Sequence, residues 1–180
     1  MKNRALESGE LSAPVVAKFH KVSFEQFRKD YGECDEKELK KIYEEILVLP
    51  VRSSDGSAGH DFVLTQDISL APGESAVIYT GIRAEIVKGW VLVLAPRSGL
   101  GSRYRLQLNN TIGIIDEDYF GADNEGHIIA TLTNDSKETG KHLLLKKGDR
   151  FIQGLFLPYG IASGDAPLGK RTGGLGHSGV

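Results

Sequence analysis

Residues 76–95, AVIYTGIRAEIVKGWVLVLA, decide the fold class. This stretch contains three short segments that are apolar or alternate in polarity, and glycines mark the junctions between them. Short segments of this kind, rich in β-branched residues and bounded by glycine, are typical of β-strands rather than of helices. We therefore expect strands at residues 76–79, 81–86 and 90–95.

The chain downstream of Pro50 shows the same pattern of short apolar segments throughout. No helical period of useful length recurs there, and short apolar runs alternate with Gly, Asp, Asn and Pro. Further strands are expected at residues 112–115, 127–133, 142–145 and 150–157. Many short strands at near-regular spacing predict an all-β sandwich or barrel.

Residues 23–47 carry helical signals instead. Ser23 and Gln26 have the spacing of a capping box, and Asp35 and Glu38 repeat that spacing. The apolar residues that follow each pair recur at helical intervals. We expect two short helices here, after an initial strand, packed against the larger β structure.

Length and composition indicate a single domain over residues 1–180. With 22 Lys+Arg against 24 Asp+Glu, the net charge of −2 gives no global attraction to nucleic acid. The single cysteine, Cys34, cannot form an internal disulfide. The first residues contain no apolar run like that of a signal peptide, and no apolar run is long enough for a membrane span, so we expect neither. We expect a cytoplasmic protein with no membrane partner. Residues 163–180 contain six glycines and predict a flexible C-terminal arm.

Two segments combine residues that suit phosphate and base chemistry. Arg97, Ser98 and Gly99 follow a buried strand and are expected on a loop, where a guanidinium, a hydroxyl and backbone N–H groups suit a phosphate. Residues 108–121, LNNTIGIIDEDYFG, place amide side chains before an apolar strand and acids after it. Asn110 and Asp116 have turn formation as their commonest role, but a hairpin edge could read a base and a carboxylate could activate water.

The order and spacing of five motifs resemble those of the trimeric dUTP nucleotidohydrolases, the dUTPases. The motifs are SAGHDF (57–62), PRSGLG (96–101), LNNTIGIIDEDYFG (108–121), GDRFIQ (148–153) and RTGGLGHSG (171–179). The resemblance implies a distorted jelly-roll β-barrel that forms a homotrimer with composite active sites. It also implies hydrolysis of dUTP to dUMP and pyrophosphate with Mg²⁺, which limits uracil in DNA and supplies dUMP for thymidylate synthesis.

The resemblance also implies roles for single residues. Asp116 is expected to deprotonate the water that attacks the α-phosphorus, and Tyr119 to pack against the deoxyribose. Asp61 is expected to bind Mg²⁺ through water, and Arg150 to support the phosphate-binding residues. The remaining substrate-binding residues are expected to be Arg97, Ser98, Gly99 and Gln153 for the phosphates, Asn110, Ile114 and Ile115 for uracil, and Arg171, Gly174, Leu175 and Gly176 in the closing arm. Arg171 and the Asp116 of the same site are expected to come from different subunits.

The chain departs from the family pattern in two places. Leu175 stands where the family usually has a phenylalanine that stacks on uracil, and His177 replaces a small hydroxyl residue. The helical segment 23–47 is an insertion relative to the minimal pattern, and it either covers the barrel or binds a partner. Two alternatives remain open at this point: a dCTP deaminase-related enzyme of the same fold, and a dUTPase-fold regulatory protein that binds a protein partner.

Overall fold

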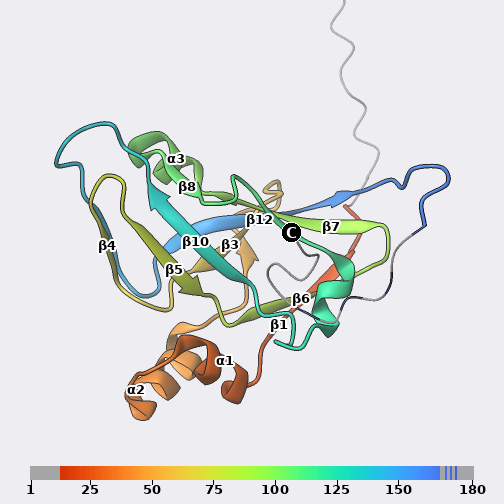
Figure 1. Ribbon diagram of the computed structural model, residues 1–180, viewed down its shortest axis with the longest axis horizontal. Coiled ribbons are helices and arrows are strands. Elements are labelled where there is room, and N and C mark those ends of the chain that lie inside the picture. The colour runs from red at the N-terminus through yellow and green to blue at the C-terminus, as the bar shows by residue number, and fades with distance from the viewer. Residues whose placement is uncertain (1–12, 167–168, 170, 172, 174–180) are drawn as a thin grey trace, which may run out of the picture.

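Strands dominate the computed structural model, which describes residues 13–166, 169, 171 and 173 (Figure 1). The strands are β1 (Ala17–Lys21), β2 (Val51–Arg52), β3 (His60–Val63), β4 (Ile68–Leu70), β5 (Ser75–Tyr79), β6 (Ile82–Ile86), β7 (Trp90–Pro96), β8 (Leu106–Leu108), β9 (Gly113–Ile115), β10 (Ile129–Asn134), β11 (Leu143–Leu145) and β12 (Arg150–Pro158). The helical elements are α1 (Phe24–Tyr31), α2 (Glu36–Lys41), the π-helix η1 (Ile42–Ile46), α3 (Ser98–Tyr104) and the 3-10 helix η2 (Glu117–Gly121).

All strand pairs of the described chain are antiparallel, and strands distant in sequence lie side by side. The largest sheet has the order β2-β3-β12-β7-β9, and a second has the order β5-β10-β8. Two smaller pairs, β1-β6 and β11-β4, complete the strand pairing. This arrangement confirms the predicted all-β, jelly-roll-like fold class.

The core forms between the inner faces of these sheets. Leu92 and Leu94 of β7 and Phe62 of β3 are almost fully buried, and they meet Ile78 of β5 and Leu132 of β10 in one continuous cluster. Alternate residues of each strand supply these side chains, because successive side chains point to opposite faces of a sheet. The core therefore fixes β7 and β9, which carry the segments of chemical interest.

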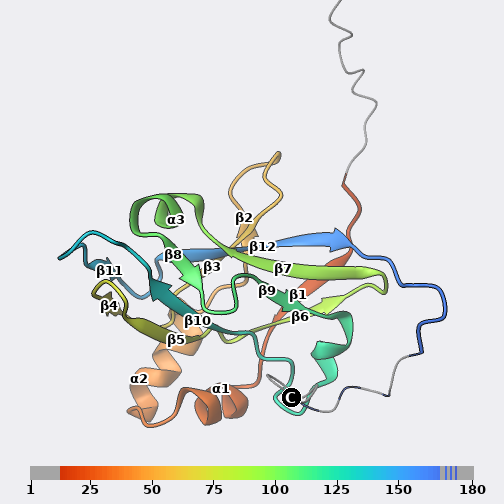
Figure 2. The same cartoon turned by 45° about the horizontal axis from the view of Figure 1, so that its top comes forward.

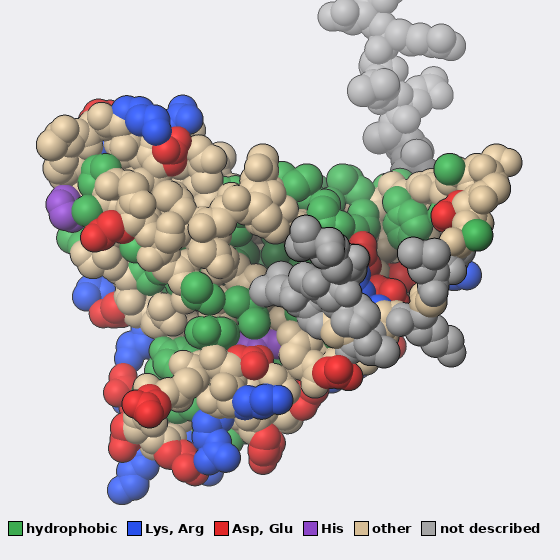
Figure 3. All heavy atoms as spheres, in the orientation of Figure 1, with side chains coloured by type: hydrophobic (Ala, Val, Ile, Leu, Met, Phe, Trp, Pro, Cys, Tyr) green, Lys and Arg blue, Asp and Glu red, His purple; other side chains and the backbone are tan. Residues whose placement is uncertain are grey.

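The two predicted helices are present, and both predicted caps form. Ser23 Oγ accepts a hydrogen bond from the Gln26 N–H at 3.1 Å, and Asp35 Oδ1 accepts one from the Glu38 N–H at 2.9 Å. Phe27 of α1 is fully buried against the β structure. Charged side chains crowd the outer face of this segment, at the lower end of the view in Figure 3.

The structure corrects several expectations about local structure. Arg97, Ser98 and Gly99 do not lie on an irregular loop, because Arg97 caps α3 and the other two residues begin that helix. The short strands β2, β3, β4 and β8 and the helix η2 were not predicted. Of the helices in the described chain, none is both long and apolar enough to cross a membrane.

Candidate active site

A buried carboxylate organises one end of the largest sheet. The side chain of Asp61 on β3 is only 7% exposed, and its Oδ1 lies 3.0 Å from Nε of Arg97. Its Oδ2 lies 3.1 Å from a terminal nitrogen of Arg150 and accepts a hydrogen bond from the Ser53 hydroxyl at 2.8 Å. A buried carboxylate needs such partners, because an unpaired charge in the interior is costly. Asp61 thus holds two guanidinium groups at one point.

A pocket of about 310 Å³ opens beside this cluster. Its lining contains the four predicted residues Asp61, Arg97, Ser98 and Gln153. The first backbone N–H groups of α3, at Ser98 and Gly99, precede the first intrahelical hydrogen bonds and are left free by helix geometry. The two guanidinium groups outnumber the single carboxylate, which leaves a net positive charge at this point. Together with the hydroxyl, amide and backbone donors, this charge suits an anion such as a phosphate chain.

A smaller pocket of about 180 Å³ lies along β9. The predicted base-binding residues Asn110, Ile114 and Ile115 line it. Strand β9 pairs with β7 and forms one edge of its sheet in the described chain, so its outer backbone groups face the pocket side without a strand partner. The predicted hairpin between Asn110 and Asp116 is corrected: a tight turn ends in an isolated bridge between Leu108 and Thr111, and β9 then joins β7.

Replacing Gly113 with alanine is expected to lower the free energy of unfolding by about 1–3 kcal/mol. A Cβ at this position would lie 2.9 Å from Cβ of Leu94, so β9 would have to move away from β7. Urea unfolding measures the change. Gly56→Ala is the matched control, because its added Cβ would meet no atom within 4 Å and should alter stability by less than about 0.5 kcal/mol. Equal stabilities of the two variants would contradict the close approach.

Asp116 directly follows β9 in the chain, and the side chain of Arg171 contacts the Asp116 carboxylate. The Arg171 guanidinium donates to Asp116 and, at 2.9 Å, to Asp118, and it lies 5.5 Å from the centre of the Tyr119 ring. Tyr119 is only 6% exposed, and burial raises its pKa. The predicted base, sugar-packing residue and arm arginine therefore meet, although here all three belong to one chain.

Asp61 and Asp116 lie far apart within one chain. Asp61 lies level with Ala95 of β7 across β12, whereas Asp116 directly follows Ile115, which pairs with Leu92. The two carboxylates are thus three strands apart across the sheet and about four residues apart along it. At about 4.8 Å per strand and 3.3 Å per residue, this separation is about 20 Å along the sheet. Figure 2 shows α3 at one end of β7, while the chain after β9 turns near the other end.

Two further points concern the predicted site residues. Gly174, Leu175 and Gly176 lie outside the described residues. Ser53, which the sequence analysis missed, joins Asp61 from a position eight residues away, and neither spacing nor composition signals that contact.

The residues of the larger pocket fit a magnesium ion that a substrate would largely hold. The described chain contains no group of three or more His, Cys, Asp or Glu side chains that could hold a metal ion by itself. Asp61 is the single carboxylate lining the pocket, and its oxygens already face Arg97, Arg150 and Ser53. Mg²⁺ usually keeps several waters and uses one or two carboxylates together with substrate phosphates. Asp61 therefore suits a contact through water better than direct ligation.

An antiparallel β fold with a cationic pocket, an edge-strand pocket and a carboxylate at the end of that strand suits a protein that hydrolyses nucleotides. The dUTPase family model matches residues 46–178. The deoxyuridine 5'-triphosphate nucleotidohydrolase of Lactococcus lactis subsp. lactis is 40% identical over 135 residues, which cover 73% of this chain and 88% of that protein. The chain belongs to the dUTPase family.

Solved structures agree with this assignment. The dUTPase from Streptococcus mutans superposes with a TM-score of 0.59 at 28% identity, covering 81% of this chain and 98% of that one. A Staphylococcus bacteriophage 80alpha dUTPase with dUPNHPP gives a TM-score of 0.60 at 21% identity, covering 91% and 98%, and supports the fold alone. The predicted family and the predicted enzyme class, a nucleotide diphosphohydrolase, are confirmed. The deaminase alternative is not favoured.

Proposed function

We propose that this protein hydrolyses dUTP to dUMP and pyrophosphate, with Mg²⁺ on the triphosphate. The observation that carries the proposal is the continuity between the edge strand and the carboxylate: Asp116 directly follows β9, whose side chains line the smaller pocket. A base bound along β9 would direct its sugar and α-phosphate toward Asp116. Family membership supports the same reaction.

Uracil recognition would use groups that both donate and accept hydrogen bonds. Asn110 carries both kinds in its amide, and the edge of β9 offers backbone N–H and C=O groups. Cytosine presents the reversed donor and acceptor pattern at the same edge, so it would leave buried groups unpaired. Such mismatches produce large discrimination.

The reaction requires a base, a leaving group and charge neutralisation. Asp116 would take a proton from the water that attacks the α-phosphorus, and the bond from that phosphorus to the bridging oxygen would break, releasing pyrophosphate. Arg97, Ser98, Gly99 and Gln153 would hold the phosphate chain, while Arg150 would support them through Asp61. A bound Mg²⁺ would neutralise phosphate charge, with Asp61 contacting its waters.

We propose a homotrimer in which each site draws on more than one subunit. The separation of about 20 Å between Asp61 and Asp116 along the sheet supports this, because a general base must lie within one hydrogen bond or one water of its target. The guanidinium groups of Arg97 and Arg150 are held at Asp61, on the far side of β12 from β9. One substrate can therefore meet both Asp116 and the guanidinium groups at Asp61 only if neighbouring chains supply them.

This reaction would keep uracil out of DNA and provide dUMP for thymidylate synthesis, and we place it in the cytoplasm. The contact between Arg171 and Asp116 would change during this reaction. When the substrate binds, the Arg171 guanidinium would leave Asp116 and bind phosphate oxygens instead, so that the Asp116 carboxylate is free to act as the general base.

We expect dUTP to be hydrolysed at least about a hundredfold faster than dCTP, dTTP or UTP, because each of these leaves a mismatch in the site. The assay is pyrophosphate release from each nucleotide with Mg²⁺. Comparable turnover of UTP would contradict the role given to Tyr119. Deamination of dCTP would contradict the proposed reaction.

A further inference from the structure

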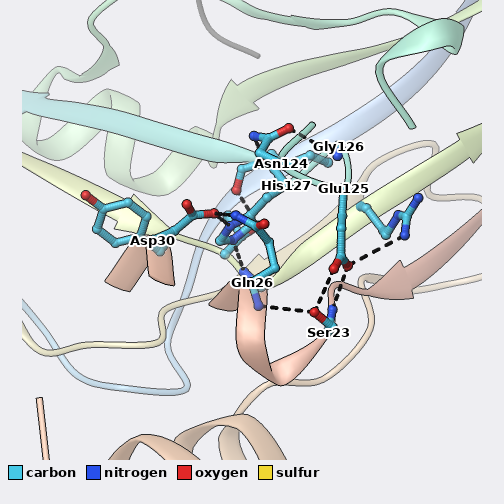
Figure 4. Close-up of polar contacts among 12 residues, drawn as sticks. Ser23, Gln26, Asp30, Asn124, Glu125, Gly126 and His127 are labelled. Carbon is cyan, nitrogen blue, oxygen red and sulfur yellow. Dashed lines mark hydrogen bonds and ion pairs between the residues drawn. The ribbon is translucent and has the colours of Figure 1, made fainter. Parts of the chain in front are cut away.

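Helix α1 contacts a buried histidine of a distant loop. His127 is fully buried, and its Nδ1 lies 2.6 Å from Oδ2 of Asp30 on α1 (Figure 4). The same carboxylate oxygen accepts a hydrogen bond from the Gln26 side chain at 2.8 Å. The contact joins residues that are 97 positions apart in the sequence. It therefore ties the helical segment to the loop that follows η2.

A backbone group fixes the tautomer of this histidine. The Gly81 N–H donates to Nε2 of His127 at 2.8 Å, so Nε2 carries no proton. Nδ1 must then carry the proton and donate it to Asp30. Burial lowers the pKa of His127, which agrees with a neutral ring. Both ring nitrogens are thus engaged, and the ring has one orientation.

The backbone of His127 in turn holds Tyr119. The Tyr119 hydroxyl donates to the His127 carbonyl at 2.8 Å, and the Asn124 amide donates to that hydroxyl at 2.9 Å. Gly126 packs against the same segment, since a Cβ there would lie 2.5 Å from the Tyr119 carbonyl oxygen. The position of the Tyr119 ring therefore depends on the loop that Asp30 anchors.

A second contact runs from the start of α1 to the same loop. Glu125 accepts hydrogen bonds from the Ser23 N–H at 2.8 Å and the Ser23 hydroxyl at 2.6 Å. Its carboxylate also lies 3.7 Å from Arg83, whose guanidinium stacks on Phe120 at 3.6 Å from the ring centre. Figure 4 shows Ser23, Gln26 and Asp30 on one side of this contact and residues 124–127 on the other. The loop is held between α1 and η2.

We propose that Asp30 and His127 are positioning residues for sugar selection, and that helix α1 thereby helps the enzyme reject ribonucleotides. The inference rests on the proposed function, in which Tyr119 packs against the deoxyribose. A Tyr119 ring whose hydroxyl is held by hydrogen bonds cannot move aside for a ribose 2′-OH, whereas a ring without those hydrogen bonds can. Neither Asp30 nor His127 touches the substrate, so they act through Tyr119.

The test compares kcat/KM for dUTP with kcat/KM for UTP. Asp30→Ala is expected to reduce this ratio at least about tenfold, because small misplacements of a contacting group have effects of this size. Asp30→Asn should restore the ratio to within about threefold of the wild type, since its amide oxygen can still accept from Nδ1. Asp35→Ala is the matched control: it removes the cap of α2, in the same helical segment, without touching residues 124–127.

The outcomes separate this inference from the proposed function. A selective wild type whose Asp30→Ala variant kept the same ratio as Asp35→Ala would overturn the inference alone. A wild type that hydrolysed UTP as fast as dUTP would overturn the role of Tyr119, and the inference with it. If Asp30→Ala does not fold, Tyr119→Phe tests the link from the other end, because it loses the bond to the His127 carbonyl and should show the same loss of selectivity. An unchanged ratio in Tyr119→Phe would refute the link.

Discussion

Replacing Asp116 with asparagine is expected to lower kcat for dUTP at least about a hundredfold, because a positioned general base contributes about 10²–10⁴ to the rate. Asparagine keeps the shape of the side chain and a hydrogen-bond acceptor, but it cannot take the proton. The Asp116 side chain is 47% exposed, so the change should cost little folding stability. Steady-state kinetics measure kcat, and equilibrium binding of a non-hydrolysable dUTP analogue measures affinity.

Asp123→Asn provides the matched control for this variant. Asp123 is exposed and lies seven residues further along the chain. It should keep wild-type kcat. Asp118→Asn should have an intermediate effect, because it leaves the base in place and removes one contact of Arg171. A base at Asp116 is refuted if Asp116→Asn stays active, or if Asp118→Asn loses as much activity.

Mixing two impaired chains is expected to restore part of the activity. Asp116→Asn chains lack the base, and Arg97→Gln chains lose a charged phosphate contact, which should lower activity about 10- to 100-fold. If Asp116 and Arg97 in one site come from different subunits, random mixing gives about a quarter of the sites both native residues. Activity should then rise from about a tenth of the wild-type value or less to about a quarter of it. If both residues came from one chain, no mixture could contain an intact site.

The mixing experiment needs co-expressed chains with different tags, so that heterotrimers can be purified and verified. Verified heterotrimers without recovered hydrolysis would rule out the shared site. The same design locates the arm. Asp116→Asn chains mixed with Arg171→Gln chains should recover activity only if Arg171 acts in a neighbouring site. Continued inactivity there would mean that Arg171 acts on the Asp116 of its own chain, as in the contact described above.

Local sequence signals accounted for much of the fold. The caps at Ser23 and Asp35 follow from side-chain chemistry within four residues, and the structure contains both. The longer strands were also predicted within one or two residues at most ends, because their apolar runs are bounded by glycine or polar residues. The edge position of β9 was not predicted, because strand order depends on pairing with distant segments.

Helix α3 and the contacts of Asp61 illustrate why the rest could not be predicted. The α3 sequence, SGLGSRY, contains two glycines and no apolar period, so its helical conformation depends on tertiary context. The ion pair of Asp61 with Arg150 joins residues 89 positions apart, and no local pattern in the sequence signals that contact. Likewise, no spacing rule connects Asp30 with His127. Such contacts arise only once the sheets have formed.

Strand β7 has a consequence for how this protein can change during evolution. Arg97 directly follows its last residue, and toward its other end it pairs with β9, which leads to Asp116. Inserting one residue into β7 would shift one end relative to the other by about 3.3 Å and turn every later side chain to the opposite face. Loops and helices can lengthen without this penalty. We expect natural variation in length to spare β7 and accumulate elsewhere, since this strand sets the distance between Arg97 and Asp116.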